Sequence, residues 1–357
     1  MKNFKGFIKL MCVCLLLCIL FVSCNTGDTS TETTNAIDET TNEPTADTSE
    51  SKDKTVINAM SYNVWASGSI KDKTETSNDG TALPRMNVVL RGPKVNAMLN
   101  GEDIDVAGFQ EVSNRSEWVK WIGNNLDEKY SYIAANTSDI ESGVYIVYKK
   151  DRFEVIDSGA FCLVDNAPAV KEGTVQKYSD SDFERICTWA VFKVKDTGEI
   201  FLFMSTHLAA ATAAGSNLTT SQLRSKQLEV LVSQISVLRD KVKTNHGISD
   251  CAVVLVGDMN STPSSNEYSI ITKTLKDSLR ISKGKKVSEA YSTYTGFWHC
   301  KTELDYKKSN FRIDYIFVST EAVSVLNYKM VHTSTNLCPY GEYMSDHNAV
   351  IAQLELY

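Results

Sequence analysis

The 357-residue sequence predicts an α/β layered sandwich that follows a polar N-terminal tail. Short runs rich in Val, Ile, Phe and Tyr alternate with segments whose apolar residues recur at helical spacing, which indicates strands interleaved with helices. Apolar residues make up 42% of the chain and charged residues 23%, as in ordinary soluble globular proteins, which excludes a fibrous, a multi-span membrane or a wholly disordered protein. The length suits one large domain plus a tail.

The N-terminus has the pattern of an export signal. Three lysines precede Leu10–Val22, thirteen residues without a charge, which are too few to span a bilayer comfortably. We therefore expect residues 1–23 to be a signal peptide and the protein to be exported, with a signal-anchor helix as the alternative. The ending Phe21-Val22-Ser23-Cys24 resembles a bacterial lipobox, which implies lipidation of Cys24 and a cell-surface or membrane-anchored lipoprotein, although Phe21 departs from the usual aliphatic residue.

Residues 24–54 are rich in Thr, Asp and Glu and hold few aliphatic side chains. Such a segment cannot bury enough apolar surface to offset its ordering entropy, so we expect a disordered tether. Of the 37 basic and 44 acidic side chains of the protein, 5 and 8 lie in the first 54 residues, which leaves a net charge of −4 for residues 55–357. This near-balanced domain slightly disfavours tight nonspecific binding of polynucleotides.

Ten short runs rich in β-branched and aromatic residues are predicted as strands. They are Ile57–Val64, Val106–Gln110, Val144–Lys149, Phe153–Leu163, Ile186–Val194, Ile200–Thr206, Ala252–Val256, Phe311–Val318, Val323–Met330 and Ala349–Leu354. Two helices are predicted: Ser221–Lys243, from its apolar spacing, and roughly Pro93–Leu99, with Pro93 at a tolerated first-turn position. The domain cysteines show no C-x-x-C spacing, so a zinc site is not expected, while disulfides and buried free thiols both remain open.

Polar groups that can handle metals or protons stand beside the predicted strands. Five apolar runs finish on them, in Ser61-Tyr62-Asn63, Gly108-Phe109-Gln110-Glu111, Ser205-Thr206-His207-Leu208, Val256-Gly257-Asp258-Met259-Asn260 and Ser345-Asp346-His347, and Arg312-Ile313-Asp314-Tyr315 places an acid inside a strand-like run. One such acid is usually a turn former or a helix cap, but six ordered cases indicate a functional site. Oxygen ligands suit a hard cation, and imidazoles beside it can move protons. This combination suits phosphate-ester hydrolysis with Mg²⁺, or with Mn²⁺ or Ca²⁺ in its place.

The order Asn, Gln-Glu, His, Gly-Asp-x-Asn, Asp-Tyr-Ile and Ser-Asp-His, from Ala59 to Val350, resembles the endonuclease/exonuclease/phosphatase superfamily with the DNase I-like fold. The resemblance implies a four-layered sandwich, in which two mainly antiparallel β-sheets pack face to face with helices outside and a catalytic cleft lies at one edge. It also implies metal-associated roles for Glu111, Asp346 and Asn63. Arg185, Asn63 and Asn260 are implied as contacts to the substrate phosphate.

The same resemblance assigns the catalytic residues. Asp258 and Asn260 correspond to the pair that orients the attacking water. His347 corresponds to the catalytic imidazole and Asp314 to the acid that orients it, and His207 matches the second histidine of the nuclease-like members. Members often have an acid six residues before the tyrosine equated with Tyr148, able to pair with that second histidine. This chain has Ser142 there, so either a one-residue shift places Glu141 beside His207 or that partner is missing.

These observations predict an exported, Mg²⁺-dependent phosphoesterase, foremost a phosphodiesterase or nuclease that hydrolyses phosphate esters by metal-assisted attack of water. The alternatives are a sphingomyelinase-like esterase of lipid headgroups and an esterase of sugar or inositol phosphates. A non-catalytic surface binding module is a remote alternative, because degenerate enzymes typically lose a metal ligand or the base. The expected partners are the phosphate-ester substrate (nucleic acid, phospholipid headgroup or sugar phosphate) and a membrane, reached through the lipid anchor, and we expect a monomer.

Overall fold

The structure, a computed structural model, describes residues 54–66, 88–112, 117–135, 143–163, 169–170, 185–212, 216–296, 311–334, 338–341 and 344–357. The expected signal peptide, Cys24 and all of the tether except Lys54 lie outside these residues. Within the described part of the chain, no helix is both long and apolar enough to cross a membrane.

One seven-stranded sheet contains the two chain segments that enter and leave the domain. Its strands are β1 (Thr55–Asn63), β2 (Val106–Gln110), β3 (Tyr130–Ala135), β4 (Val144–Lys149), β11 (Lys286–Val287), β13 (Val323–Val331) and β14 (Ala349–Leu356), in the order β11-β13-β14-β1-β2-β4-β3. Strand β1 lies between β14, which is antiparallel to it, and β2, which is parallel. Thr55 is opposite Leu356, so β1 begins where β14 ends, and its Asn63 end lies at the other edge.

The second sheet also has seven strands. They are β5 (Phe153–Cys162), β6 (Ala169–Val170), β7 (Ile186–Val194), β8 (Ile200–His207), β9 (Ala252–Asp258), β10 (Lys276–Asp277) and β12 (Asp314–Val318), in the order β10-β12-β9-β8-β7-β5-β6. Strands β8 and β9 are parallel, and the other neighbours are antiparallel. Both sheets are therefore mixed and mainly antiparallel.

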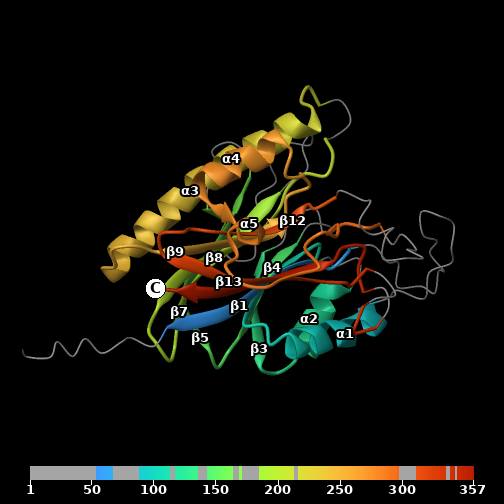
Figure 1. The fold of residues 1–357 in the computed structure, drawn as a ribbon, viewed down its shortest axis with the longest axis horizontal. Helices are drawn as coiled ribbons and strands as arrows, with labels where there is room; N and C mark the ends of the chain where they lie inside the picture. Colours follow the sequence, from blue (N-terminus) through green and yellow to red (C-terminus); the bar gives the residue numbers. More distant parts are fainter. Residues whose placement is uncertain are drawn as a thin grey trace, which may run out of the picture. The chain divides into compact units, whose positions relative to one another are not determined.

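Helices cover the outer faces of the two sheets. Helices α1 (Val88–Gly101) and α2 (Trp118–Asn125) lie on one side, and α3 (Thr220–His246) and α4 (Asn266–Thr274) on the other, with the single turn of α5 (Ser278–Ile281) beside β12 (Figure 1). The buried apolar residues form an inner core between the sheets, which includes Ile57 and Val254, and two outer cores beneath the helices. This arrangement confirms the predicted four-layered sandwich.

The two sheets pack closely against each other at Gly108, near the end of β2. A Cβ atom added to Gly108 would lie 2.3 Å from Val256 Cγ2 and 2.5 Å from Ser205 Oγ. Only glycine leaves room for this approach without a shift of the neighbouring strands. Gly108 thereby sets how near Glu111, three residues further along the chain, comes to the residues of the second sheet.

All ten predicted strands are present, with differences at their ends. Phe311–Ile313 does not belong to β12, because the backbone N–H of Ile313 donates to the Thr293 hydroxyl and the Phe311 carbonyl accepts from Thr293 and Tyr294 rather than from a neighbouring strand. Helix α1 begins five residues before Pro93, which therefore lies in the second turn and not in the first as predicted. Helix α3 begins at a capping box formed by Thr219 and Gln222. Cys187, Cys251 and Cys338 are buried free thiols.

Candidate active site

Strand direction brings the predicted site residues to one edge of the sandwich. Parallel strands have their carboxyl ends at the same edge, so His207, the last residue of β8, lies next to Asp258, the last residue of β9. Strand β12 runs the other way and begins at this edge with Asp314, directly opposite Asp258. Three adjacent strands thus place an imidazole and two carboxylates in one row.

His347 and Asp314 form a buried pair. Nδ1 of the imidazole lies 2.9 Å from Asp314 Oδ2, and Nε2 points towards Asp258, with 3.7 Å to its Oδ2. Burial alone would lower the pKa of His347, but Asp314, Asp258 and Asp346 together raise it well above its usual value. These carboxylates therefore favour the protonated ring, and Asp314 holds it in a fixed orientation.

Asp258 occupies the centre of the site and is almost fully buried. Its Oδ1 accepts from the backbone N–H of Asn260 (2.8 Å), and its Oδ2 accepts from Nδ2 of Asn63 (3.1 Å). Burial, followed by repulsion from Asp314, raises the pKa of Asp258 to about 7. A carboxylate with this pKa can accept a proton near neutral pH, which is the property of a general base.

His207 and Asn260 form the side of the site nearest to α3. Asn260 Nδ2 lies 3.0 Å from His207 Nε2 and also donates to the Leu208 carbonyl (3.0 Å). Because an amide NH₂ only donates, Nε2 acts as the acceptor, and the proton of the neutral ring is assigned to Nδ1. Burial, and then the charges of Arg185 and His347, lower the pKa of His207 well below its usual value, in agreement with a neutral ring.

Nδ1 of His207 is buried and meets no hydrogen-bond partner among the described residues. Ser142 and Glu141, the two positions expected to hold the acid that pairs with His207, lie outside the described residues. Glu141 as the partner of His207 and a missing partner therefore both remain open.

Asn63 and Glu111 form the opposite side of the site. Asn63 Nδ2 donates to Glu111 Oε1 (3.0 Å), and the backbone N–H of Ala66 donates to Glu111 Oε2 (2.7 Å). Glu111 has a φ of 62°, Trp65 one of 62° and Asn260 one of 47°, so three non-glycine residues around the site adopt the left-handed conformation. This conformation is costly for L-residues and is typical of sites where backbone geometry serves a function.

Negative charge exceeds positive charge at this edge. Among the described residues, the four acids Glu111, Asp258, Asp314 and Asp346 are opposed by three cationic groups, those of His347, Arg185 and Arg91. Burial, and then repulsion from Glu111, raise the pKa of Asp346 to about 7. A divalent cation bound by carboxylate oxygens would relieve this repulsion, so the residues fit the expected metal. Glu111 and Asp346 lie outside the strands, whereas Asp258 and Asp314 belong to β9 and β12, and the contact of Asp346 with His347 Nε2 is long, at 4.0 Å.

A second cluster of side chains, Asp258, Asp314 and His347, is also compact enough to hold an ion. Single ligand atoms of Asp258, Asp314 and His347 lie within 4.8 Å of one another. A metal there would require a neutral imidazole, whereas the surrounding carboxylates favour the protonated ring. We therefore interpret these three residues as the proton-handling group and place the metal side at Glu111 and Asp346.

Arg185 stands immediately before β7 and faces the same site. Burial lowers the pKa of its guanidinium, and the charges of Glu111 and Asp258 offset part of that effect. Its Nε is buried and meets no hydrogen-bond partner among the described residues. An unused planar donor next to the catalytic acids suits a phosphate oxygen.

Asn63 was expected to contact both the metal and the phosphate. Its Oδ1 accepts from the backbone N–H of Trp65 (3.0 Å), and its Nδ2 points at Glu111 and Asp258. In this orientation it presents a donor to the centre of the site, which favours the phosphate contact. All the expected catalytic, phosphate and metal residues thus meet at one edge, while their individual roles stay predictions.

Two residues of the site carry no sequence signal that would have singled them out. The Tyr294 ring packs against His347, with ring centroids 4.9 Å apart, and the two residues form an isolated β-bridge. Asn348 is fully buried and joins three segments, since its Oδ1 accepts from Thr333 and Ser334 while its Nδ2 donates to the Ser292 carbonyl. Tyr294 lies in an irregular segment, and Asn348 differs in no visible way from a surface asparagine.

Comparison with known proteins agrees with this geometry. The model of the Endonuclease/Exonuclease/phosphatase family matches residues 60–347. A family protein from Bacteroides vulgatus superposes with a TM-score of 0.61 at 23% identity, over 85% of this chain and 100% of the other. The mannosyl-6-phosphatase Bt3783 of Bacteroides thetaiotaomicron gives 0.57 at 22% identity, over 84% and 99%.

The D. rerio protein TDP2, crystallised with a single-strand DNA product, gives a TM-score of 0.53 at 19% identity, over 84% of this chain and 98% of the other. At these identities the structural matches establish the fold. No curated protein matches the sequence. The family match covers most of the chain and includes the whole row of acids and imidazoles. The chain therefore belongs to the endonuclease/exonuclease/phosphatase family and is a hydrolase of phosphoric esters.

Proposed function

We propose that the protein is an exported, Mg²⁺-dependent phosphodiesterase. The observation that carries this proposal is the row formed by His207, Asp258 and Asp314, which His347 completes. It places a carboxylate whose pKa is about 7 within 4 Å of an imidazolium, so a proton acceptor and a proton donor coexist near neutral pH.

The two proton transfers of the reaction are assigned to Asp258 and His347. Asp258 accepts the proton of the attacking water as the new P–O bond forms, and the Asn260 backbone N–H holds Asp258 Oδ1 in place. His347, oriented by Asp314, donates its proton to the leaving oxygen as the old P–O bond breaks.

Donors around this centre bind the phosphate. Arg185 supplies a guanidinium, whose Nε meets no hydrogen-bond partner among the described residues, as charge develops on the phosphate oxygens. Asn63 and Asn260 contact the phosphate by exchanging one of their present Nδ2 hydrogen bonds for the substrate, and His207 stands beside Asn260. Glu111 and Asp346 would hold the cation, which when bound neutralises charge on a phosphate oxygen and orients the ester. Mn²⁺ or Ca²⁺ are the alternatives to Mg²⁺ at these oxygen ligands.

Asp258→Ala and His347→Ala test the assignment. Each should reduce turnover of bis-p-nitrophenyl phosphate by several orders of magnitude, since loss of a positioned acid or base alone costs about 10²–10⁴-fold. Asp240→Asn, which changes an exposed carboxylate of α3, is the matched control and should leave turnover unchanged. Near-normal hydrolysis by either folded alanine variant would contradict the proposal.

The substrate can be determined with a panel. Plasmid DNA, RNA, sphingomyelin, bis-p-nitrophenyl phosphate and sugar phosphates, each with Mg²⁺, separate a nuclease from a lipid-headgroup esterase and from a sugar-phosphate esterase. Similarity to TDP2 supports the nucleic-acid arm, and similarity to a mannosyl-6-phosphatase supports the sugar-phosphate arm. Turnover of sugar monophosphates without cleavage of any diester would replace the diesterase proposal with a monoesterase.

We further propose that Cys24 is lipidated and anchors the exported enzyme to a membrane, as a monomer. The support is the sequence alone: a basic start, a short apolar run and the lipobox-like ending at Cys24. Cys24→Ser should move the enzyme from the membrane fraction to the soluble exported fraction. An unchanged distribution would contradict the anchor, and gel filtration of the domain tests the monomer.

A further inference from the structure

Arg91, in the first turn of α1, is a buried cation that the reaction described above does not use. Only 1% of its surface is exposed. Its Nη1 donates to the Val64 carbonyl (2.6 Å) and to the Met344 carbonyl (3.0 Å), and its Nη2 donates to the Trp65 carbonyl (3.2 Å). One guanidinium therefore joins two segments that are far apart in the sequence: the end of β1 and the loop before β14.

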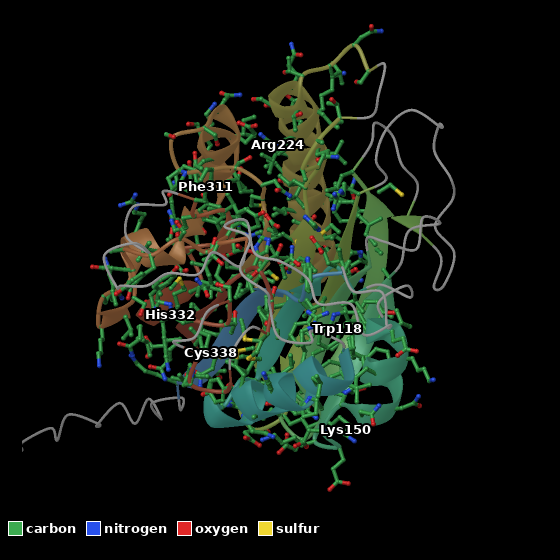
Figure 2. The ribbon with its side chains drawn as sticks, turned by 90° about the vertical axis from the view of Figure 1, so that its right-hand side faces the viewer. Trp118, Lys150, Arg224, Phe311, His332 and Cys338 are labelled. Carbon is green, nitrogen blue, oxygen red and sulfur yellow. The ribbon has the colours of Figure 1, made fainter. Side chains whose placement is uncertain are left out.

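Two tryptophans enclose the Arg91 guanidinium. Its Cζ lies 5.0 Å from the ring centroid of Trp65 and 5.0 Å from that of Trp118. Trp118 belongs to α2 (Figure 2). Trp118 also donates from Nε1 to the Trp65 carbonyl (3.2 Å). A planar cation between aromatic rings holds a fixed orientation, which an ammonium on a flexible stem would not reproduce.

The Val64–Trp65 segment carries one side of the active site. Trp65 adopts a φ of 62°, and its backbone N–H donates to Asn63 Oδ1 (3.0 Å). The next residue, Ala66, donates its N–H to Glu111 Oε2 (2.7 Å). Because a left-handed tryptophan is unfavourable by itself, contacts to its carbonyl are needed to hold the turn. Arg91 and Trp118 provide those contacts.

The segment from Met344 to His347 forms the other side of the active site. Asp346 and His347 lie two and three residues after Met344, and Ser345 Oγ, between them and Met344, donates to the Asn63 carbonyl (2.7 Å). The position of Asp346 relative to Glu111 thus depends on the join between these two segments. Arg91 is the charged group at that join.

We propose that Arg91 is a positioning residue that sets the separation of Glu111 and Asp346, and so the affinity of the site for a divalent cation. This inference rests on the proposed function. An arginine is neither a metal ligand nor a base, and Arg91 acts on the two acids through the backbone carbonyls of Val64, Trp65 and Met344.

Electrostatics and positioning predict opposite results for removal of the Arg91 charge. A cation close to Asp346 repels a second cation, so by charge alone Arg91→Met should strengthen binding of Mg²⁺. If Arg91 positions the two acids, the same variant should weaken that binding, because the segments that carry them are no longer joined. The sign of the change therefore separates the two explanations.

The experiment measures Mg²⁺ binding to the purified protein without substrate, by calorimetry and by the rise of Tm with Mg²⁺ concentration. Arg91→Met, Arg91→Lys and Trp118→Phe perturb the join, and circular dichroism checks that each variant is folded. Arg152→Met is the matched control: Arg152 donates to the Val56 carbonyl of the same strand β1 and lies over the Phe153 ring, but at the end of β1 remote from Asn63.

We expect Arg91→Met and Arg91→Lys to weaken Mg²⁺ binding by about 10- to 100-fold, the range found when groups that orient metal ligands are removed. Trp118→Phe should weaken it less, and excess Mg²⁺ should restore much of the turnover of all three. Arg152→Met should lower Tm without changing Mg²⁺ affinity. If Arg91→Met does not fold, Arg91→Lys and Trp118→Phe decide the question in the same way.

Unchanged or tighter Mg²⁺ binding in the folded variants, with normal binding by the wild type, would overturn the positioning role and leave the proposed function intact. An equal loss of affinity in Arg152→Met would also overturn it, because general destabilisation would then suffice. A wild-type protein that binds no Mg²⁺ and hydrolyses no ester would instead overturn the proposed function, and the positioning role with it.

Discussion

Replacing Asp314 with asparagine changes one charge in the centre of the site and almost no volume. Asp314 is fully buried, and its Oδ2 lies 2.9 Å from His347 Nδ1. The asparagine amide can turn its NH₂ towards the imidazole, which would force Nδ1 to become an acceptor and reverse the tautomer. The variant therefore tests whether the charge and orientation of His347, rather than the packing around it, support turnover.

The expected loss of kcat follows from the hydrogen bond between Asp314 and His347, which the substitution weakens or removes. A hydrogen bond to a charged group contributes about 1.5–3 kcal/mol. If the imidazolium uses that bond in the transition state, its loss lowers kcat by about 10- to 150-fold. The pKa of His347 falls because its principal carboxylate is gone, and the pKa of Asp258 also falls because Asp314 no longer repels it. Activity needs ionised Asp258 and protonated His347, so both limbs of the pH profile should move to lower pH.

The assay measures kcat and kcat/KM for bis-p-nitrophenyl phosphate on the acid and alkaline limbs of the pH profile at saturating Mg²⁺. The Tm of each variant is measured alongside. Asp277→Asn is the control, because Asp277 is another buried acid, whose Oδ2 lies 2.6 Å from Arg312 Nη2, and it has no part in the proposed proton transfers. It should lower Tm and leave both limbs in place. Wild-type kcat with unmoved limbs in Asp314→Asn would refute the assignment of His347 and Asp314 as a proton-handling pair.

Four further outcomes are expected. EDTA should abolish turnover and Mg²⁺ should restore it, because the acids at the site require a compensating cation; activity that survives exhaustive chelation would contradict this. Tyr294→Leu should lower kcat by about 2- to 10-fold, since an aromatic pair contributes about 0.5–1.5 kcal/mol, whereas Tyr294→Phe should retain it, as steady-state kinetics would show. Leu231→Ala, within the core beneath α3, should lower the free energy of unfolding in urea by about 2–5 kcal/mol, and a loss below this range would mean that the core relaxes around the cavity. Gly108→Ala should destabilise the protein by about 1–3 kcal/mol in the same assay, and a neutral result would show that Val256 and Ser205 can move apart.

The sequence was sufficient for the fold class and for the polar residues at strand ends, because a strand with one or two buried faces leaves a clear apolar pattern and the groups that end it stand out. Short or amphipathic elements left weaker patterns. Strand β3 has the short sequence Tyr-Ser-Tyr-Ile-Ala-Ala, and α2 has only eight residues, so the sequence predicts neither. Their formation depends on packing against β4 and α1, which local propensity does not report.

The supporting residues of the site were beyond sequence reasoning for a different reason. A charged residue such as Arg91 is expected at the surface. Its burial depends on carbonyls that lie 27 and 253 residues away along the chain. Similarly, Tyr294 belongs to the site only because its segment is held between the start of β12 and the strand that follows His347. Such contacts follow from the assembled fold and not from local periodicity.

Strand β1 lies inside its sheet, and its first residue, Thr55, is at the end remote from Asn63. Proteolysis before Lys54 would therefore remove no residue of the described strands and no catalytic residue, whereas trimming into β1 would remove an internal strand and unfold the enzyme. Shedding of the proposed lipid-anchored form would release a fully active, freely diffusing one. A protease could thus decide how far from the cell phosphate esters are cleaved, without any change to the catalytic site.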